Sequence, residues 1–275
     1  MKKMVVFLLL AFVLLSACQP SPAEPEQAAP DEGAVQTAIA QTAAAQPTET
    51  SPPPTETAEP EPTEVPPTEA PVNTPLPEGI LFRDDFNGAI LPDWTIESEI
   101  PERWSISDEG EVVIIATIGG VPYTWDDANN HQDNLFLIPA PGGEYMITTH
   151  IRTDVFMNFH QAAIIIYEDP DNWMLLNRGY CDLCVPGGDG IFMDYKIEGA
   201  GGGYKIPFKA DDVYLRIVHT EGRYESYYAE KEGEWTRLGR VGGYIEPEKL
   251  GFGASNRAEG DDMTAYFDYF EVARP

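Results

Sequence analysis

Two arginines in otherwise apolar strand patterns are the first residues of this sequence that could bind a ligand. Arg178 ends the run WMLLNR, and Arg216 interrupts the run VYLRIV. A charge that is taken out of water needs a counter-ion or a ligand. Each arginine therefore has two possible roles, an internal ion pair with Asp or Glu or a contact with a bound molecule. In the second role, Gln161 and Tyr228 of other strand patterns would add hydrogen-bonding groups that suit sugar hydroxyls.

The segment Tyr123–Asp127, together with Asn129–Gln132, has the composition of a ligand-binding loop. Tyr123 and Trp125 offer flat apolar faces that can stack on sugar rings. Asp127 offers a carboxylate that can accept hydrogen bonds from hydroxyls. We therefore predict that this loop contributes these three side chains to a carbohydrate site.

The pair Cys181 and Cys184 is separated by two residues and lies between strand patterns. In an exported protein such a pair predicts a disulfide with a small ring. Free thiols are the second interpretation. A zinc half-site is the third interpretation. It is less favoured because a second ligand pair is missing and the four histidines are scattered along the chain.

The segment His160–Leu176 predicts the hairpin that organises the rest of the domain. Ala162–Tyr167 is an unbroken apolar run rich in β-branched residues, which is typical of a strand covered on both faces. Glu168–Asn172 contains only turn formers, and Trp173–Leu176 resumes the apolar pattern. A strand of this kind lies centrally between two layers, so we predict an all-β, two-sheet sandwich. Gly199–Gly203 is expected to be a flexible hairpin loop.

Residues 1–18 have the features of a lipoprotein signal peptide. Two lysines precede Met4–Leu15, an apolar stretch too short to span a membrane comfortably. The following Leu-Ser-Ala-Cys resembles the bacterial lipobox, which implies cleavage before Cys18 and acylation of its thiol and amine. Two or three acyl chains suffice for stable anchoring. We expect an extracytoplasmic protein that is anchored to a membrane through Cys18; the alternative is an ordinary secreted protein.

Residues 19–78 have the composition of a disordered tether. This segment holds 15 of the 25 prolines and 11 acidic residues, with no lysine, arginine or aromatic residue. Such a segment cannot bury enough apolar surface to offset the entropy lost on ordering.

Residues 79–275 form the predicted globular domain, which carries 35 acidic and 15 basic residues, a net charge of −20. Nucleic acid and anionic lipid surfaces bind through basic faces, so this balance argues against both as partners.

Six short motifs of the domain occur in the order found in a known fold. The motifs are DDFNG (84–88), Trp94, WSISDEGEVVI (104–114), HQAAIIIYEDPDNWMLLNR (160–178), VYLRIVHTEGRYESYYAEKEGEWTRLG (213–239) and FDYFEV (267–272). Together they resemble the concanavalin A-like lectin/glucanase jelly-roll domain, which is appended to many β-xylosidases and is also found alone as a domain of unknown function. The resemblance implies a two-sheet antiparallel jelly roll with a concave sheet that can hold sugar.

The same resemblance implies a structural Ca²⁺ that joins the first strand, a glycine turn and the last strand. The matching positions are Asp85, Gly110 and Asp268. Carboxylate and carbonyl oxygens are the ligands that Ca²⁺ prefers. The alternative is that the two aspartates cap strand ends without a metal.

The expected function is non-catalytic carbohydrate binding. Related laminarinases and lichenases carry paired glutamates in a Glu-x-Asp-x-x-Glu pattern, and this domain contains no such run. Glu168, Asp169 and Asp171 are clustered, but Pro170 places them in a turn. Two alternatives stay open: a glycoside hydrolase or lyase with an unrecognised carboxylate pair, and a structural or protein-interaction module of the cell envelope.

Overall fold

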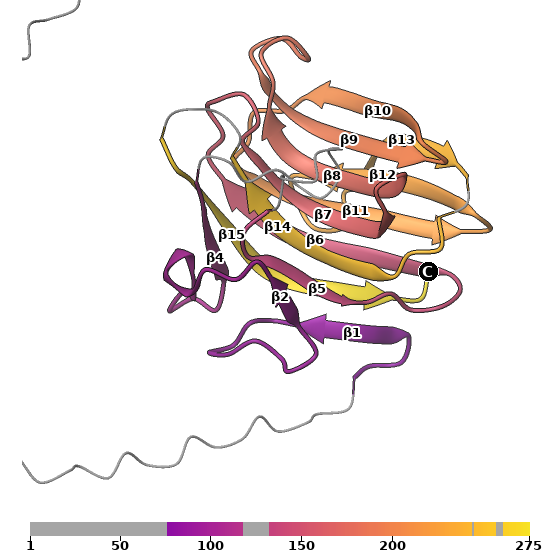
Figure 1. The fold of residues 1–275 in the computed structure, drawn as a ribbon, viewed down its shortest axis with the longest axis horizontal. Helices are drawn as coiled ribbons and strands as arrows, with labels where there is room; N and C mark the ends of the chain where they lie inside the picture. Colours follow the sequence, from indigo (N-terminus) through magenta and orange to yellow (C-terminus); the bar gives the residue numbers. More distant parts are fainter. Residues whose placement is uncertain (1–75, 118–131, 244, 257–260) are drawn as a thin grey trace, which may run out of the picture. The chain divides into compact units, whose positions relative to one another are not determined.

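Fifteen β-strands and one short 3-10 helix make up the part of the chain that the computed structural model describes (Figure 1). This part comprises residues 76–117, 132–243, 245–256 and 261–275. All of it belongs to one compact unit, Glu69–Pro275. The predicted signal peptide with Cys18, the predicted tether up to residue 75, and the predicted loop residues Tyr123, Trp125 and Asp127 lie outside the described residues. Within the described ranges, no helix has the length and hydropathy needed to cross a bilayer.

The strands pair antiparallel in two sheets, as predicted for the sandwich. Sheet A contains eight strands. Seven of them form one continuous order, and β1 (Ile80–Asp84) pairs with β15 outside this order. The main path of sheet A runs in the order β13 (Thr236–Gly242), β12 (Arg223–Ala229), β11 (Asp212–Thr220), β6 (Tyr145–Thr153), β15 (Met263–Ala273), β4 (Val112–Ala116) and β3 (Trp104–Ile106).

Sheet B contains the remaining seven strands. Its strand order is β10 (Ala200–Pro207), β9 (Asp189–Ile197), β8 (Asn172–Tyr180), β7 (Gln161–Asp169), β14 (Lys249–Ser255), β5 (Leu135–Pro139) and β2 (Thr95–Glu97). The 3-10 helix η1 (Pro101–Arg103) directly precedes β3.

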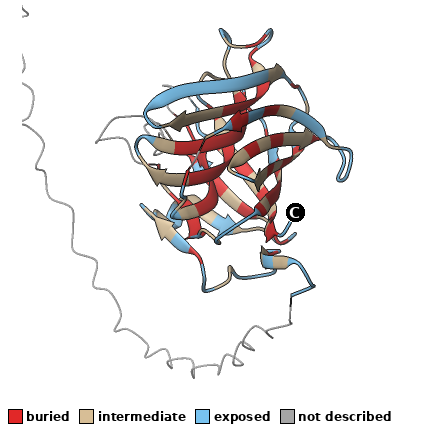
Figure 2. Ribbon diagram, turned by 90° about the vertical axis from the view of Figure 1, so that its right-hand side faces the viewer, coloured by how far each residue is buried: buried red, intermediate tan, exposed pale blue. Residues whose placement is uncertain are grey.

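The main core lies between the inner faces of the two sheets. Successive side chains of a strand point to opposite faces, so alternate residues of each strand enter this core. In β11, Val213, Leu215 and Ile217 are buried in the core, whereas Tyr214 and Arg216 between them face outward. Figure 2 shows the resulting pattern of buried and exposed residues along the strands, with β10 exposed along most of its length.

The predicted hairpin is present and occupies the centre of sheet B. β7 and β8 pair directly, and the turn between them is Pro170-Asp171. Ala162, Ile164 and Ile166 of β7 face the main core. The outer face of sheet B carries a second buried apolar cluster, made of Leu135, Leu137, Ala163, Ile165, Trp173 and Leu175. Apolar residues on both sides of β7 therefore explain its unbroken apolar run.

The expectation of a flexible loop over Gly199–Gly203 is wrong. The turn is confined to Glu198 and Gly199, which have φ angles of 50° and 76°. Positive φ at both central residues is the geometry of a tight two-residue hairpin. β10 begins at Ala200 and pairs with β9 along its whole length. Gly201–Gly203 therefore belong to an edge strand, whereas the sequence predicted a loop.

The DDFNG motif and Trp94 meet at a buried carboxylate. Asp84 Oδ1 accepts a hydrogen bond from Phe86 N at 2.9 Å, and Asp84 Oδ2 accepts from Leu91 N and Trp94 Nε1, both at 2.8 Å. Trp94 in turn packs edge-on against Phe252 of the core, with ring centroids 5.2 Å apart. Asp84 thus fixes the loop that follows the first strand.

Candidate functional site

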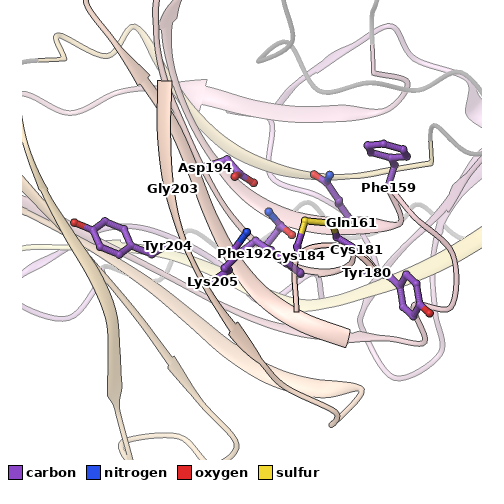
Figure 3. Close-up of a pocket in the computed structure, with 11 residues that line it drawn as sticks. Phe159, Gln161, Tyr180, Cys181, Cys184, Phe192, Asp194, Gly203, Tyr204 and Lys205 are labelled. Carbon is purple, nitrogen blue, oxygen red and sulfur yellow. A yellow bond between two sulfur atoms is a disulfide. The ribbon is translucent and has the colours of Figure 1, made fainter. Parts of the chain in front are cut away.

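A pocket of about 290 Å³ hollows the outer face of sheet B near its β10 edge (Figure 3). Its described lining comes from strands β7 to β10 and from the loops at their ends. These residues are Phe159, Gln161, Asn177, Tyr180, Cys181, Cys184, Phe192, Asp194, Gly203, Tyr204 and Lys205. The lining combines aromatic rings with amide, carboxyl and ammonium groups, which is the mixture found in small-molecule sites.

Strand register brings the polar side chains together. Lys205 of β10 pairs with Phe192 of β9, and Phe192 pairs with Asn177 of β8. In the next row along the same face, Gly203 of β10 pairs with Asp194 of β9. Because same-face residues on one strand are two positions apart, these four side chains and the Gly203 backbone lie beside one another.

Asn177 is the most unusual residue of the pocket. Its side chain is only 1% exposed, and its Oδ1 has no hydrogen-bond partner among the described residues, whereas its amide NH₂ group lies toward the Asp194 carboxyl. Gln161 Oε1 is also buried without a partner in that part of the chain. A buried polar atom that makes no hydrogen bond costs about 1–3 kcal/mol. A ligand that donates hydrogen bonds to these atoms would remove this cost.

Asp194 carries the carboxyl group of the pocket. Burial raises its pKa to about 6, and a hydrogen bond from the Asn177 side chain and the charge of the Lys205 ammonium oppose this effect only in part. Asp194 therefore changes its charge state within the mildly acidic range. Among the described residues that line the pocket, it is the only Asp or Glu.

A disulfide between Cys181 and Cys184 forms one wall of the pocket. The loop that contains it is also closed by backbone hydrogen bonds, from Cys181 N to Gly188 O at 2.8 Å and from Gly188 N to Val185 O at 3.0 Å. Both cysteines are therefore fixed relative to the end of β8.

Of the ligand residues predicted from sequence and described by the structure, only Gln161 lines this pocket. Tyr228 is half-buried and packs against the main core, where its ring meets Phe208 edge-on at 5.6 Å. Its position is therefore inside the sandwich rather than in the pocket.

Arg178 takes the internal role. It follows Asn177 in β8 and so points to the opposite, inner side of sheet B, where it is fully buried. Its Nη2 lies 3.0 Å from Asp189 Oδ1 and 3.5 Å from Asp211 Oδ1, and its Nε donates to Ala210 O at 2.9 Å. The prediction that Arg178 contacts a ligand is replaced by the ion-pair alternative.

Arg216 lies on the other sheet. It projects from the outer face of sheet A, stacks on Trp235 with the guanidinium carbon 3.9 Å from the ring centroid, and donates from Nε to Thr148 Oγ1 at 3.0 Å. The prediction that it shares a site with Gln161 is wrong, because β11 and β7 belong to different sheets.

The predicted calcium ligands meet only in part. Asp85 O lies 3.7 Å, and Asn87 Oδ1 3.4 Å, from the point that a Cβ on Gly110 would occupy. Asp268, however, faces His150, with Asp268 Oδ2 3.2 Å from Nδ1. In the described part of the chain, no three His, Cys, Asp or Glu side chains converge as metal ligands would. Oxygens do surround Gly110, and Ca²⁺ there stays a prediction.

The sequence did contain a signal for the residues that were missed. Asn177 interrupts an apolar run just as Arg178 does, and Asp194 interrupts the run GIFMDY. Applying the argument for buried polar groups to these two residues would have found them. Lys205 and Phe192 carry no such signal, because their place in the pocket depends on strand pairing.

No protein-family model and no curated protein sequence matches this chain. Similar solved structures exist. A GH43 protein, BlXynB, from Bacillus licheniformis matches with a TM-score of 0.59 and 18% identity over 70% of this chain and 39% of its own. A xylan beta-1,4-xylosidase from Bacillus halodurans C-125 matches with a TM-score of 0.59 and 18% identity over 75% of this chain and 41% of its own.

A beta-glucanase from Bacillus licheniformis matches with a TM-score of 0.51 and 10% identity, over 70% of this chain and 98% of that protein. The chain spans about two-fifths of the length of the first two proteins. At these identities the likeness concerns the fold. The described residues adopt the concanavalin A-like jelly-roll β-sandwich, as the six motifs predicted.

Proposed function

We propose that this domain binds carbohydrate without cleaving it, at the pocket on the outer face of sheet B. The observation that carries the proposal is a pair of buried acceptors, Asn177 Oδ1 and Gln161 Oε1, which both lack a partner among the described residues. Sugar hydroxyls donate hydrogen bonds, so they complement both acceptors. The Phe192 ring beside Asn177 adds an apolar surface for the C–H face of a sugar.

The names of the similar structures support a sugar ligand. One is a xylan beta-1,4-xylosidase and another a beta-glucanase, and both names refer to polysaccharides. The transfer of that ligand class to this chain is part of the proposal, since the likeness concerns the fold. The net charge of −29 fits a neutral or weakly charged ligand better than nucleic acid.

The non-catalytic assignment is supported by the acidic groups of the pocket. Glycoside hydrolysis generally uses two carboxyl groups, about 5–5.5 Å apart in retaining enzymes and about 6.5–9.5 Å apart in inverting ones. Asp194 is the only acidic side chain among the described lining residues. The described part of the pocket therefore contains no second carboxyl group that could act together with Asp194.

One observation favours the hydrolase alternative. A buried carboxyl with a pKa of about 6 has the property of a general acid. The two functions differ in their products: a binding protein leaves an oligosaccharide intact, whereas a hydrolase releases shorter sugars. Release of reducing ends that stops in an Asp194→Asn variant would establish the hydrolase.

We also propose that the domain is attached to a membrane by acyl chains on Cys18 and displayed outside the cytoplasm on the 19–78 tether. The support is the lipobox-like sequence before Cys18. In a Cys18→Ser variant, the protein should leave the membrane fraction or keep its signal peptide. Retention of this variant in salt-washed membranes would contradict the anchor.

The binding proposal is tested by titrating the full-length protein, in detergent, with xylo- and gluco-oligosaccharides in a calorimeter. Asn177→Leu should weaken binding at least about tenfold, because each lost hydrogen bond to a sugar hydroxyl contributes about 0.5–1.5 kcal/mol. The same variant should lower the melting temperature by no more than about 4 °C, since the carboxamide loses only its contact with the partly exposed Asp194.

The matched control is Gln132→Leu. Gln132 is also a buried amide whose acceptor has no described partner, but it does not line the pocket, so binding should be unchanged. A folded wild-type protein that binds neither oligosaccharide series would overturn the proposal. Equal loss of binding in both variants would show that the effect does not arise in the pocket.

A further inference from the structure

Gly179 of β8 lies next to both buried acceptors of the proposed sugar site. It pairs directly with Gln161 of β7 and follows Asn177 by two positions, so all three residues share the outer face of sheet B. Its φ angle is not positive, so the backbone conformation itself does not require glycine. A glycine inside a strand often marks a place that another group approaches closely.

The group that approaches Gly179 is the Asn177 amide. A Cβ on Gly179 would lie 2.6 Å from Asn177 Oδ1, 3.0 Å from His160 O and 3.4 Å from Gln161 Cγ. His160 O is held in place because it accepts a hydrogen bond from Tyr180 N at 3.0 Å. Asn177 Oδ1, at the end of a side chain, can move by rotation. A methyl group at position 179 would therefore displace the Asn177 amide.

The Asn177 amide contributes to the site at both of its ends. Its Oδ1 is one of the two buried acceptors without a described partner, and Gln161 Oε1 is the other. Its NH₂ group makes a hydrogen bond to Asp194 that lowers the pKa of this carboxyl against the effect of burial. Because the amide is planar and rigid, a rotation that moves Oδ1 also moves the NH₂ group away from Asp194.

From these observations, and resting on the proposed function, we infer that Gly179 is a positioning residue of the sugar site. Its bare backbone lets Asn177 Oδ1 lie beside the Gln161 side chain, so that both acceptors bind one ligand. The same placement keeps the Asn177 NH₂ group on Asp194.

The test is a double-mutant cycle in the full-length protein, measured by calorimetry with xylo- and gluco-oligosaccharides. Gly179→Ala should weaken binding about fivefold to tenfold, because the Asn177 acceptor leaves its place. In an Asn177→Ala background, which has no amide to displace, Gly179→Ala should change the affinity by less than about twofold.

A second readout needs no sugar. The pKa of Asp194, followed through its carboxyl carbon signal in NMR spectra, should rise above the wild-type value of about 6 in Gly179→Ala, because the Asn177 hydrogen bond is lost. In the Asn177→Ala background, Gly179→Ala should leave the pKa of Asp194 unchanged.

Gly253 of β14 provides the matched control. A Cβ there would meet the Gln132 amide, whose carboxamide carbon is 3.2 Å from that point, and neither residue lines the pocket. Gly253→Ala should therefore leave sugar affinity unchanged. Equal losses in Gly253→Ala and Gly179→Ala would show a general distortion of sheet B and overturn the inference.

Equal effects of Gly179→Ala in both backgrounds would also overturn the positioning role and leave the proposed function intact. If Gly179→Ala does not fold, Asn177→Ala should restore folding, and failure to do so would place the strain at His160 O instead. A wild-type protein that binds no sugar would remove the proposed function, while the pKa of Asp194 would still decide whether Gly179 orients Asn177.

Discussion

Gly203 of β10 lies directly against the carboxyl group of Asp194. A Cβ on Gly203 would be 3.1 Å from Asp194 Oδ1 and 2.8 Å from the backbone oxygen of Met193. The missing side chain thus leaves space on the pocket side of an exposed edge strand, next to the buried carboxyl. A glycine at this position keeps the pocket open.

The first prediction is that Gly203→Ala weakens sugar binding, because the new Cβ meets the Met193 backbone oxygen at 2.8 Å and Asp194 Oδ1 at 3.1 Å, so β9 or β10 must shift beside the pocket. We expect a loss of about tenfold or more, measured by calorimetry. The matched control is Gly201→Ala, two residues earlier on the same face, where a Cβ would have only an ordinary 3.9 Å contact with Tyr195 O. Equal affinities for the two variants would contradict the assignment of Gly203 to the site.

The second prediction concerns the pH dependence of stability. The pKa of Asp194 is raised from 3.8 to about 6 on folding because the carboxyl is buried. Its contribution to stability is therefore fully present below pH 3.8 and is lost as the pH rises through about 6. Asp194→Asn removes this titration, so the variant should gain stability relative to wild type between pH 4 and pH 7.5.

The expected gain is on the order of 1–3 kcal/mol, measured as the difference between the two proteins in urea unfolding at each pH. Comparing the two proteins cancels the other carboxyl groups, which titrate in both. A difference that stays constant from pH 4 to pH 7.5 would show that Asp194 has an ordinary pKa.

The sequence predicted the strands better than it predicted the faces they present. The predicted strand segments Ala162–Tyr167 and Trp173–Leu176 lie within β7 and β8, because an unbroken apolar run marks a strand that is covered on both faces. Asn177 and Arg178 show where this reasoning ends. They are neighbours in one strand and so point to opposite sides of sheet B, but which of them faces the core depends on the register with β7 and β9.

The sheet that a strand joins also depends on its pairing with strands far away in the sequence. Gln161 and Arg216 both lie in strands with similar patterns, and only the strand pairing separates them into sheets B and A. The edge strand β10 gave no apolar signal at all, since almost all of its residues are exposed. Three of the eleven described lining residues, Gly203, Tyr204 and Lys205, therefore come from a strand whose first glycines had no strand signal.

The third prediction separates the structural role of Arg178 from the ligand role first considered for it. Asp189→Ala leaves the buried guanidinium with Asp211 as its only carboxylate neighbour among the described residues. Removing one partner of a buried pair costs about 3–5 kcal/mol, and the partial exposure of Asp189 reduces this to about 1–3 kcal/mol. The unfolding free energy in urea measures this loss.

In an Arg178→Met background, Asp189→Ala should cost less than about 0.5 kcal/mol, because the interaction is already absent. Sugar affinity should be the same in Arg178→Met and wild type. If that variant kept its stability and lost binding, Arg178 would be a ligand residue after all.

The fourth prediction concerns calcium. Ca²⁺ held by the oxygens of Asp85 and Asn87 around Gly110 would make a chelator lower the melting temperature, because an ion that binds only the folded state stabilises it. Asp268→Ala should melt with the same chelator dependence as wild type, because the Asp268 carboxylate faces His150. A wild-type melting curve that is the same in metal-stripped buffer with and without added Ca²⁺ would contradict the prediction.

The central claim, sugar binding at the pocket of sheet B, is tested most directly by the side-chain amide signals in ¹⁵N–¹H NMR spectra of the full-length protein during titration with the best-binding oligosaccharide. The Asn177 and Gln161 amides should shift, because they gain hydrogen bonds to the sugar. The Asn172 amide, which already bonds Asp169 Oδ1 at 3.1 Å in the hairpin turn, should stay in place. A saturable titration that leaves Asn177 and Gln161 unchanged and shifts the Trp235 indole signal beside Arg216 would contradict the claim and place the sugar on sheet A.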